Sequence, residues 1–151
     1  MWWMYCAVPS GHVLRLHPER VFFWAYGHIV IFGSLAAVGA GMHVAAYYLE
    51  HHTKIGAVGT VLSVAIPLAV FVLMLYGLWT ALMRRRDPFH IGLLLGTTAV
   101  LVLAVVLAEA GVSMAWCLVV LALAPVVTVV GYETLGHRHQ EDSLTQMKQL
   151  G

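Results

Sequence analysis

Histidine and glutamate side chains follow one face of an apolar stretch in the first third of the chain. His28 and His43 lie inside a run without Asp, Glu, Lys or Arg, and Glu50 follows that run directly. At the helical period of about 3.6 residues, these three side chains share one face. The histidines are 43 − 28 = 15 residues apart, about 22 Å along a helix axis. Ionisable groups inside a bilayer are costly and usually face a bundle interior, a cavity or a partner, so this face suggests movement of protons or ions.

A purely structural role for these side chains stays open. A neutral His28 that bonds a carbonyl of a neighbouring helix or a tyrosine hydroxyl would only pack and orient the helices. Tyr26 is the candidate tyrosine. His43 and Glu50 lie closer to the headgroups, where a polar side chain needs no functional explanation.

A second polar group is expected at the outer surface, beside His43. Its members are Glu50, His51, His52 and Glu109. Their nitrogen and oxygen atoms suit a divalent metal or a group that titrates near neutral pH. A solvated loop is the competing interpretation, and a zinc site would need a fixed third ligand. The sequence therefore predicts no metal site and gives Glu109 as a possible partner of the polar face.

The opposite face of the same stretch carries a stripe of small residues. Gly33, Ala37 and Ala40 would let another helix approach closely. We interpret the stripe as a packing surface. The sequence leaves open whether the packing is within the chain or between two copies.

Four apolar stretches, each long enough to cross a bilayer as a helix, must position these residues. They cover 21–49, 55–83, 91–108 and 110–132. A spanning helix needs about 20 residues, whereas spanning strands alternate in polarity over about ten. Hydrophobic residues make up 61% of the chain and charged residues 10%, against roughly 45–50% and about 25% in soluble domains. The predicted fold class is all-α, an integral membrane bundle of four transmembrane helices.

Charges outside the four stretches predict the orientation. Only Lys54 falls on one side of a four-helix topology, and seven basic residues fall on the other: Arg15, Arg20, Arg84, Arg85, Arg86, Arg138 and Lys148. The positive-inside rule then places both termini in the cytoplasm. We expect an interfacial segment over 1–20 that reads as the end of a helix missing here. A four-helix domain over 21–135 and a polar cytoplasmic tail over 136–151 follow it.

Several short motifs lie in the first two apolar stretches and in the segment before them. They are Trp2-Trp3-Met4-Tyr5, Tyr26 with His28, Gly33, Gly39, and a helix that closes on Arg84-Arg85-Arg86. Together they resemble the C-terminal portion of the bacterial low temperature requirement A family, whose members are longer multi-helix membrane proteins. The resemblance implies a bacterial membrane protein and brings no assigned reaction, cofactor or substrate.

The sequence favours a multi-pass protein of the bacterial cytoplasmic (inner) membrane, a transport or proton-linked component with His28 on its functional face. No nucleophile elbow, phosphate loop or metalloprotease helix occurs, so we expect neither enzymatic activity nor a cofactor. A haem-binding redox subunit, with His90 as the partner of His28, is one alternative. A structural subunit of a helical assembly is another. The expected partners are lipid and either other transmembrane helices or a second copy, and the net charge of +1 gives no reason to expect nucleic acid.

Overall fold

The computed structural model describes residues 21–83 and 88–131. This part of the chain forms four helices: α3 (Val21–Leu49), α4 (Ala57–Met83), α5 (Pro88–Glu109) and α6 (Met114–Gly131). Each of them is long and apolar enough to cross a membrane. The predicted all-α, four-helix fold is confirmed, and the described ranges contain no strand. The predictions for the interfacial segment, the three arginines and the polar tail lie outside the described residues.

α4 and α6 begin later than predicted, because the residues just before them form turns. Thr53 Oγ1 accepts a hydrogen bond from the Ile55 amide at 3.1 Å, and the Gly56 carbonyl accepts one from the Thr60 amide at 3.0 Å. Gly56 thus takes the capping position of α4. In the second case Gly111, with a φ of 77°, ends α5, so α6 starts at Met114 rather than at residue 110. Conversely, α5 begins at Pro88, where the fixed φ of proline suits a first helical turn.

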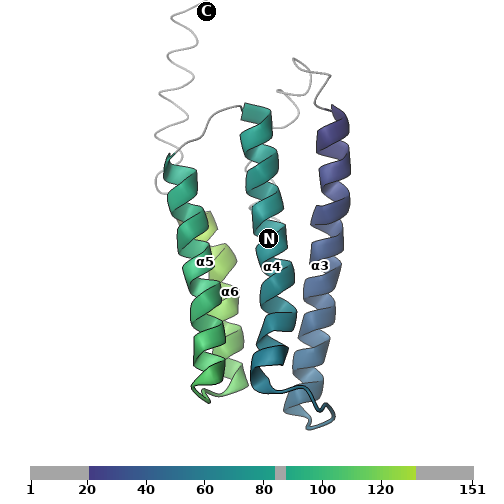
Figure 1. Cartoon of the computed structure of the whole chain (residues 1–151), viewed down its shortest axis with the longest axis vertical. Helices are drawn as coiled ribbons and strands as arrows, with labels where there is room; N and C mark the ends of the chain where they lie inside the picture. The colour runs from purple at the N-terminus through teal and green to yellow at the C-terminus, as the bar shows by residue number, and fades with distance from the viewer. Residues whose placement is uncertain (1–20, 84–87, 132–151) are drawn as a thin grey trace, which may run out of the picture.

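The four helices run alternately up and down, with α4 between α3 and α5 (Figure 1). The α3–α4 and α5–α6 connections lie at one end of the bundle, called the loop end below. α4 packs against all three other helices, whereas α3 packs mainly on α4. Accordingly, 44% of the spanning window of α4 is buried, against 22% for α3. α3 is therefore an edge helix, and one side of it faces out of the described bundle.

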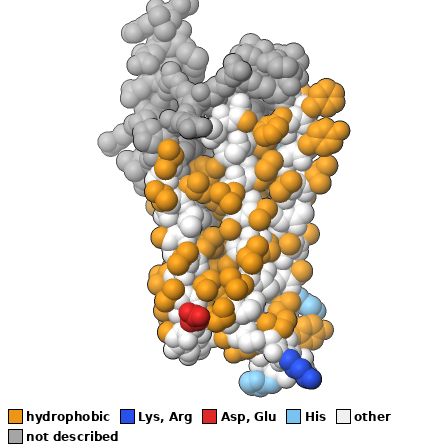
Figure 2. Space-filling view, viewed as in Figure 1, with side chains coloured by type: hydrophobic (Ala, Val, Ile, Leu, Met, Phe, Trp, Pro, Cys, Tyr) orange, Lys and Arg blue, Asp and Glu red, His pale blue; other side chains and the backbone are white. Residues whose placement is uncertain are grey.

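The outer surface of the bundle is apolar, unlike that of a water-soluble protein. Large apolar side chains such as Phe22, Ile29 and Leu95 are exposed, and apolar side chains are spread along the visible face of the bundle (Figure 2). The buried polar side chains are His28, Ser34, Thr60, Thr97 and Thr128. Their hydroxyl groups bond carbonyls of their own helices, as polar groups must where water is absent. This arrangement suits hydrocarbon as the surrounding solvent.

The bundle interior consists of two apolar clusters. The larger one joins α4, α5 and α6 through buried side chains that include Val61, Leu68, Ala104 and Leu121. The smaller one joins α3 and α4 at the end away from the loops, around Ile31 and Phe71.

Candidate functional site

His28 is a buried histidine on α3, with 9% of its surface exposed. Its Nδ1 lies 2.6 Å from the Trp24 carbonyl oxygen, one helical turn earlier. Because a carbonyl oxygen can only accept, Nδ1 carries the hydrogen and donates it. The bond fixes both the tautomer and the direction of the ring.

Two aromatic rings flank the His28 imidazole along α3. The Trp24 ring centroid is 4.0 Å from that of His28, and the Phe32 centroid is 5.8 Å from it. Both distances are within the roughly 6 Å at which a cation is attracted to an aromatic ring. Tyr26, the predicted partner, is 67% exposed and projects from a different side of the helix, since two residues span about 200° of rotation. The geometry therefore places Trp24 and Phe32, not Tyr26, beside the imidazole.

His43 does not share the buried surroundings of His28. Its side chain is exposed, and its ring meets the edge of the Tyr47 ring at a centroid distance of 4.7 Å. Fifteen residues leave the two histidines about 60° apart around the axis. That offset is enough to put one against α4 and the other outside, because α4 covers only one side of α3. The predicted polar face is therefore not a continuous buried path.

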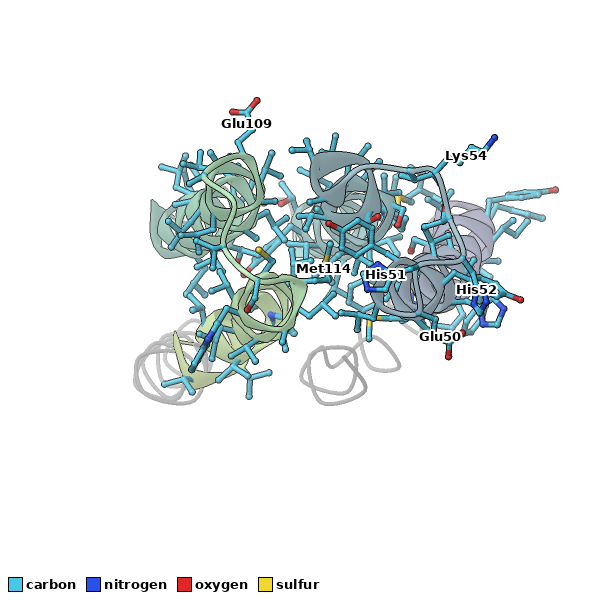
Figure 3. The ribbon with its side chains drawn as sticks, turned by 90° about the horizontal axis from the view of Figure 1, so that it is seen from below. Glu50, His51, His52, Lys54, Glu109 and Met114 are labelled. Carbon is cyan, nitrogen blue, oxygen red and sulfur yellow. The ribbon has the colours of Figure 1, made fainter. Side chains whose placement is uncertain are left out.

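Glu50 and its neighbours form an exposed turn at the loop end. Glu50 Oε2 lies 3.4 Å from Nδ1 of His52, and these side chains are 63% and 70% exposed. Glu109 lies across the width of the bundle from His52 and Lys54 (Figure 3). The predicted gathering of Glu109 with this turn is wrong, because α5, which ends at Glu109, packs on α4 rather than on α3. Among the described residues, no three His, Cys, Asp or Glu side chains are placed to hold a metal ion.

The small-residue stripe of α3 lies on its outer side. Gly33, Ala37 and Ala40 are exposed, and a Cβ added at Gly33 would meet no atom within 4 Å. Packing of this stripe within the described bundle, one of the two alternatives, is therefore wrong. The physical reason is that α3 is an edge helix whose single neighbour covers the opposite side. Packing against a second copy remains a prediction.

The α3 surface that does contact α4 follows a different register. Its buried residues are Gly27, His28, Ile31, Ser34, Gly41 and Ala45. Most of them are separated by three, four or seven residues, the spacing of a helix–helix seam. His28 lies at the border of this seam. Gly27 and Gly41 of the seam are as small as the exposed Gly33, so residue size alone could not identify the buried face.

A second buried polar cluster, which was not predicted, joins α5 and α6. Thr97 Oγ1 and Thr128 Oγ1 are 2.8 Å apart, and Tyr76 of α4 lies beside Thr128. Each threonine hydroxyl also lies within hydrogen-bonding distance of a carbonyl of its own helix, Leu93 at 2.9 Å and Ala124 at 3.5 Å. Thr97 falls in register with the buried Leu101 and Ala104 along α5, which was the only usable signal.

Four apolar helices with an apolar outer surface and polar side chains inside define a multi-pass α-helical membrane protein. The model of the family described as bacterial low temperature requirement A protein (LtrA) matches residues 1–125, and the chain belongs to this family. The resemblance inferred from the sequence motifs is thus confirmed. The searches of curated proteins and of solved structures gave no match.

Proposed function

We propose that this protein is a noncatalytic, proton-linked transport component of the bacterial cytoplasmic membrane, in which the imidazole of His28 takes up and releases protons. The supporting observation is the position of His28, a titratable side chain buried in an apolar helix with its ring fixed by the Trp24 carbonyl. Ionisable residues within membrane segments are rare and usually functional. The proposal involves no chemical transformation of a substrate.

The surroundings of His28 suit both protonation states. In the neutral ring, Nδ1–H donates to the Trp24 carbonyl. Protonation at Nε2 leaves the Nδ1–H bond in place and makes it charge-assisted, which strengthens it. The Trp24 and Phe32 rings then lie beside a cation. A proton could thus bind and leave without a change in the orientation of the ring.

The direction of transfer follows from the proposed orientation. His28 is seven residues after Val21, about 10 Å along α3, and lies in the half of the helix away from the loop end. The excess of Lys and Arg on the side of the termini supports a cytoplasmic location for that half. His28 would therefore exchange protons with the cytoplasm.

Proton flux in liposomes tests the proposal. The reconstituted protein should speed the collapse of an imposed pH gradient, read with an internal pH dye. His28→Asn keeps a short side-chain donor for the Trp24 carbonyl but cannot titrate, and His28→Gln is a second nontitratable variant. With either variant, the pH gradient should collapse only as fast as in protein-free liposomes. The matched control is His43→Asn, which removes an exposed histidine of the same helix and should retain the wild-type rate. Equal rates for wild type and His28→Asn would reject the proposal.

A structural role for His28 is the competing function, and the same bond to Trp24 favours it, because it ties the side chain to its own helix. Under that alternative, His28→Asn leaves flux and assembly unchanged, while His28→Ala lowers thermal stability. The haem alternative also remains a prediction. A Soret band in the purified protein that disappears in His28→Asn would support it in place of proton uptake.

A further inference from the structure

Pro67 interrupts the hydrogen-bond ladder of α4 within its spanning segment. Proline has no backbone N–H, so the Ser63 carbonyl, four residues earlier, lacks the donor that a regular helix would supply. In the hydrocarbon core no bulk water is present to replace it, and a neighbouring group must do so. The position of this carbonyl is therefore of interest.

Gly41 of α3 lies directly against the Ser63 carbonyl. A Cβ built on Gly41 would collide with the Ser63 carbonyl oxygen, and it would stand 2.7 Å from the carbonyl carbon and 3.0 Å from the Val64 nitrogen. On glycine a Cα hydrogen takes the place of that Cβ, so this hydrogen points at the oxygen. Contacts of this kind between a Cα–H group and a carbonyl recur at helix–helix interfaces. Gly41 thus offers a Cα–H contact to the carbonyl that Pro67 leaves without its backbone donor.

The Ser63 hydroxyl lies beside the same contact. It donates to the Thr60 carbonyl of its own helix at 2.7 Å and lies 3.5 Å from the Gly41 carbonyl of α3. The contact of Gly41 with the Ser63 carbonyl nevertheless joins main-chain atoms of α3 and α4. Main-chain atoms cannot change rotamer, so this end of the interface is rigid.

The other end of the same interface is built differently. A Cβ at Gly27 would meet only the tips of the Leu78 and Met74 side chains, at 2.8 to 3.0 Å. Flexible side chains can adopt other rotamers, and methionine is especially adaptable. Gly27 and Gly41 are 41 − 27 = 14 residues apart, about 21 Å along α3. The interface is thus rigid toward the loop end and adaptable at the end that carries His28.

We propose that the Gly41–Ser63 contact is a fixed pivot about which α3 tilts against α4. The tilt opens and closes the end of the interface at which His28 is buried, while the loop end keeps its position. Such a hinge would give the His28 ring alternating contact with the protein interior and with the membrane surface. The inference adds a motion to the proposed function, but its test measures distances and involves no proton flux.

Spin-label distances in lipid nanodiscs test the pivot, in a background of Cys6→Ser and Cys117→Ala. One label pair uses the exposed positions Phe22 and Leu73, which report on the His28 end, and the other uses the exposed positions Met42 and Ile66, which flank the pivot. For a hinge, the distance distribution of the first pair should be about twofold wider than that of the second. Equal widths at the two ends would overturn the pivot and would leave the proton proposal to the flux assay.

Substitution at the pivot gives the second measurement. Gly41→Ala should broaden the distribution of the Met42–Ile66 pair, because the added methyl group forces the two backbones apart. Gly33→Ala is the matched control on the same helix, since its methyl group would meet nothing, and it should change neither distribution. If Gly41→Ala does not fold, Ser63→Ala removes only the hydroxyl link and should broaden the same pair to a smaller extent. An unchanged pair in both variants would reject the pivot.

Discussion

The Thr97 hydroxyl of α5 lies 2.8 Å from the Thr128 hydroxyl of α6, inside the bundle. Both side chains are buried, with exposed fractions of 1% and 6%. Hydrogen bonds between membrane helices contribute on the order of 0.6 to 2 kcal/mol, less than expected for an apolar solvent because the unfolded state in the membrane also finds partners. This pair should therefore fix the register of α5 against α6 and add modestly to stability.

Replacing Thr97 with valine should lower the free energy of unfolding by about 1 kcal/mol, because it removes the hydroxyl and keeps the shape. The measurement is equilibrium unfolding in mixed micelles of a mild detergent and dodecyl sulfate. Combining Thr97→Val with Thr128→Val in a double-mutant cycle should give a coupling of about 0.5 to 1 kcal/mol. Thr98→Val is the control, since that exposed hydroxyl bonds only the Leu94 carbonyl of its own helix. A loss for Thr98→Val equal to that for Thr97→Val would contradict an interhelical role.

His51 ends α3 in a backbone conformation that favours glycine. Its φ is 59°, and the amides of His51 and His52 bond the Tyr48 and Tyr47 carbonyls at 3.1 and 2.9 Å. This is a Schellman motif with histidine at the left-handed position, where a Cβ costs roughly 1 kcal/mol. His51→Gly should therefore raise the free energy of unfolding by about 0.5 to 1 kcal/mol, measured in the same micelles.

Gly111 provides the opposite control for this prediction. It ends α5 with a φ of 77°, and the same pattern of amide bonds runs to the Ala108 and Leu107 carbonyls. Gly111→Ala should therefore lower stability by about 1 kcal/mol. If His51→Gly and Gly111→Ala changed the free energy of unfolding in the same direction, the strain inferred from the φ angles at the two helix ends would be contradicted.

The helices were predictable because a bilayer imposes a simple rule on sequence. In a bilayer, a continuous apolar run of about 20 residues can form all its backbone hydrogen bonds only as a helix. The presence and the number of the helices therefore followed from the apolar runs in the sequence. The first helix was placed correctly at both ends, since charged or polar residues flank it. The start of α6 was predicted four residues early, because the turn at Gly111 is itself apolar in sequence. Hydropathy therefore locates membrane helices better than it locates their ends.

The site was predictable only in part, because membrane helices lack the polarity pattern that marks the buried face of a soluble helix. His28, which the sequence singled out, is buried in α3, and its role as a titratable group stays a prediction. His43 is exposed although it lies only about 60° from His28 around the axis, since which side of α3 meets α4 depends on packing. Nothing in the sequence distinguishes the exposed stripe of Gly33 from the buried seam of Gly41. Only the neighbouring backbone decides between them.

Cys117 is fully buried in the larger cluster, and its Sγ lies 3.8 Å from the Val112 carbonyl oxygen. Its thiol should react with a maleimide only when the bundle opens, so in a Cys6→Ser background we expect labelling at least about tenfold slower than after denaturation in dodecyl sulfate. Mass spectrometry of the intact protein gives the labelled fraction. The comparison is Trp116→Cys in a Cys6→Ser, Cys117→Ala background, which places a thiol at a position 65% exposed and should label quickly. Rapid labelling of Cys117 in the folded protein would show that α6 does not pack as described.

The proposed orientation gives the last prediction. Lys54 is the one Lys or Arg residue in the turn between α3 and α4. Seven Lys and Arg residues fall on the other side of the topology. The positive-inside rule therefore places this turn outside the cytoplasm. His52 is 70% exposed in that turn, so in a cysteine-free background His52→Cys should react with a membrane-impermeant maleimide added to intact spheroplasts. Ser143→Cys, in the tail predicted to be cytoplasmic, should react only after the membrane is permeabilised. The reverse pattern would invert the topology, and His28 would then exchange protons with the outer side rather than with the cytoplasm.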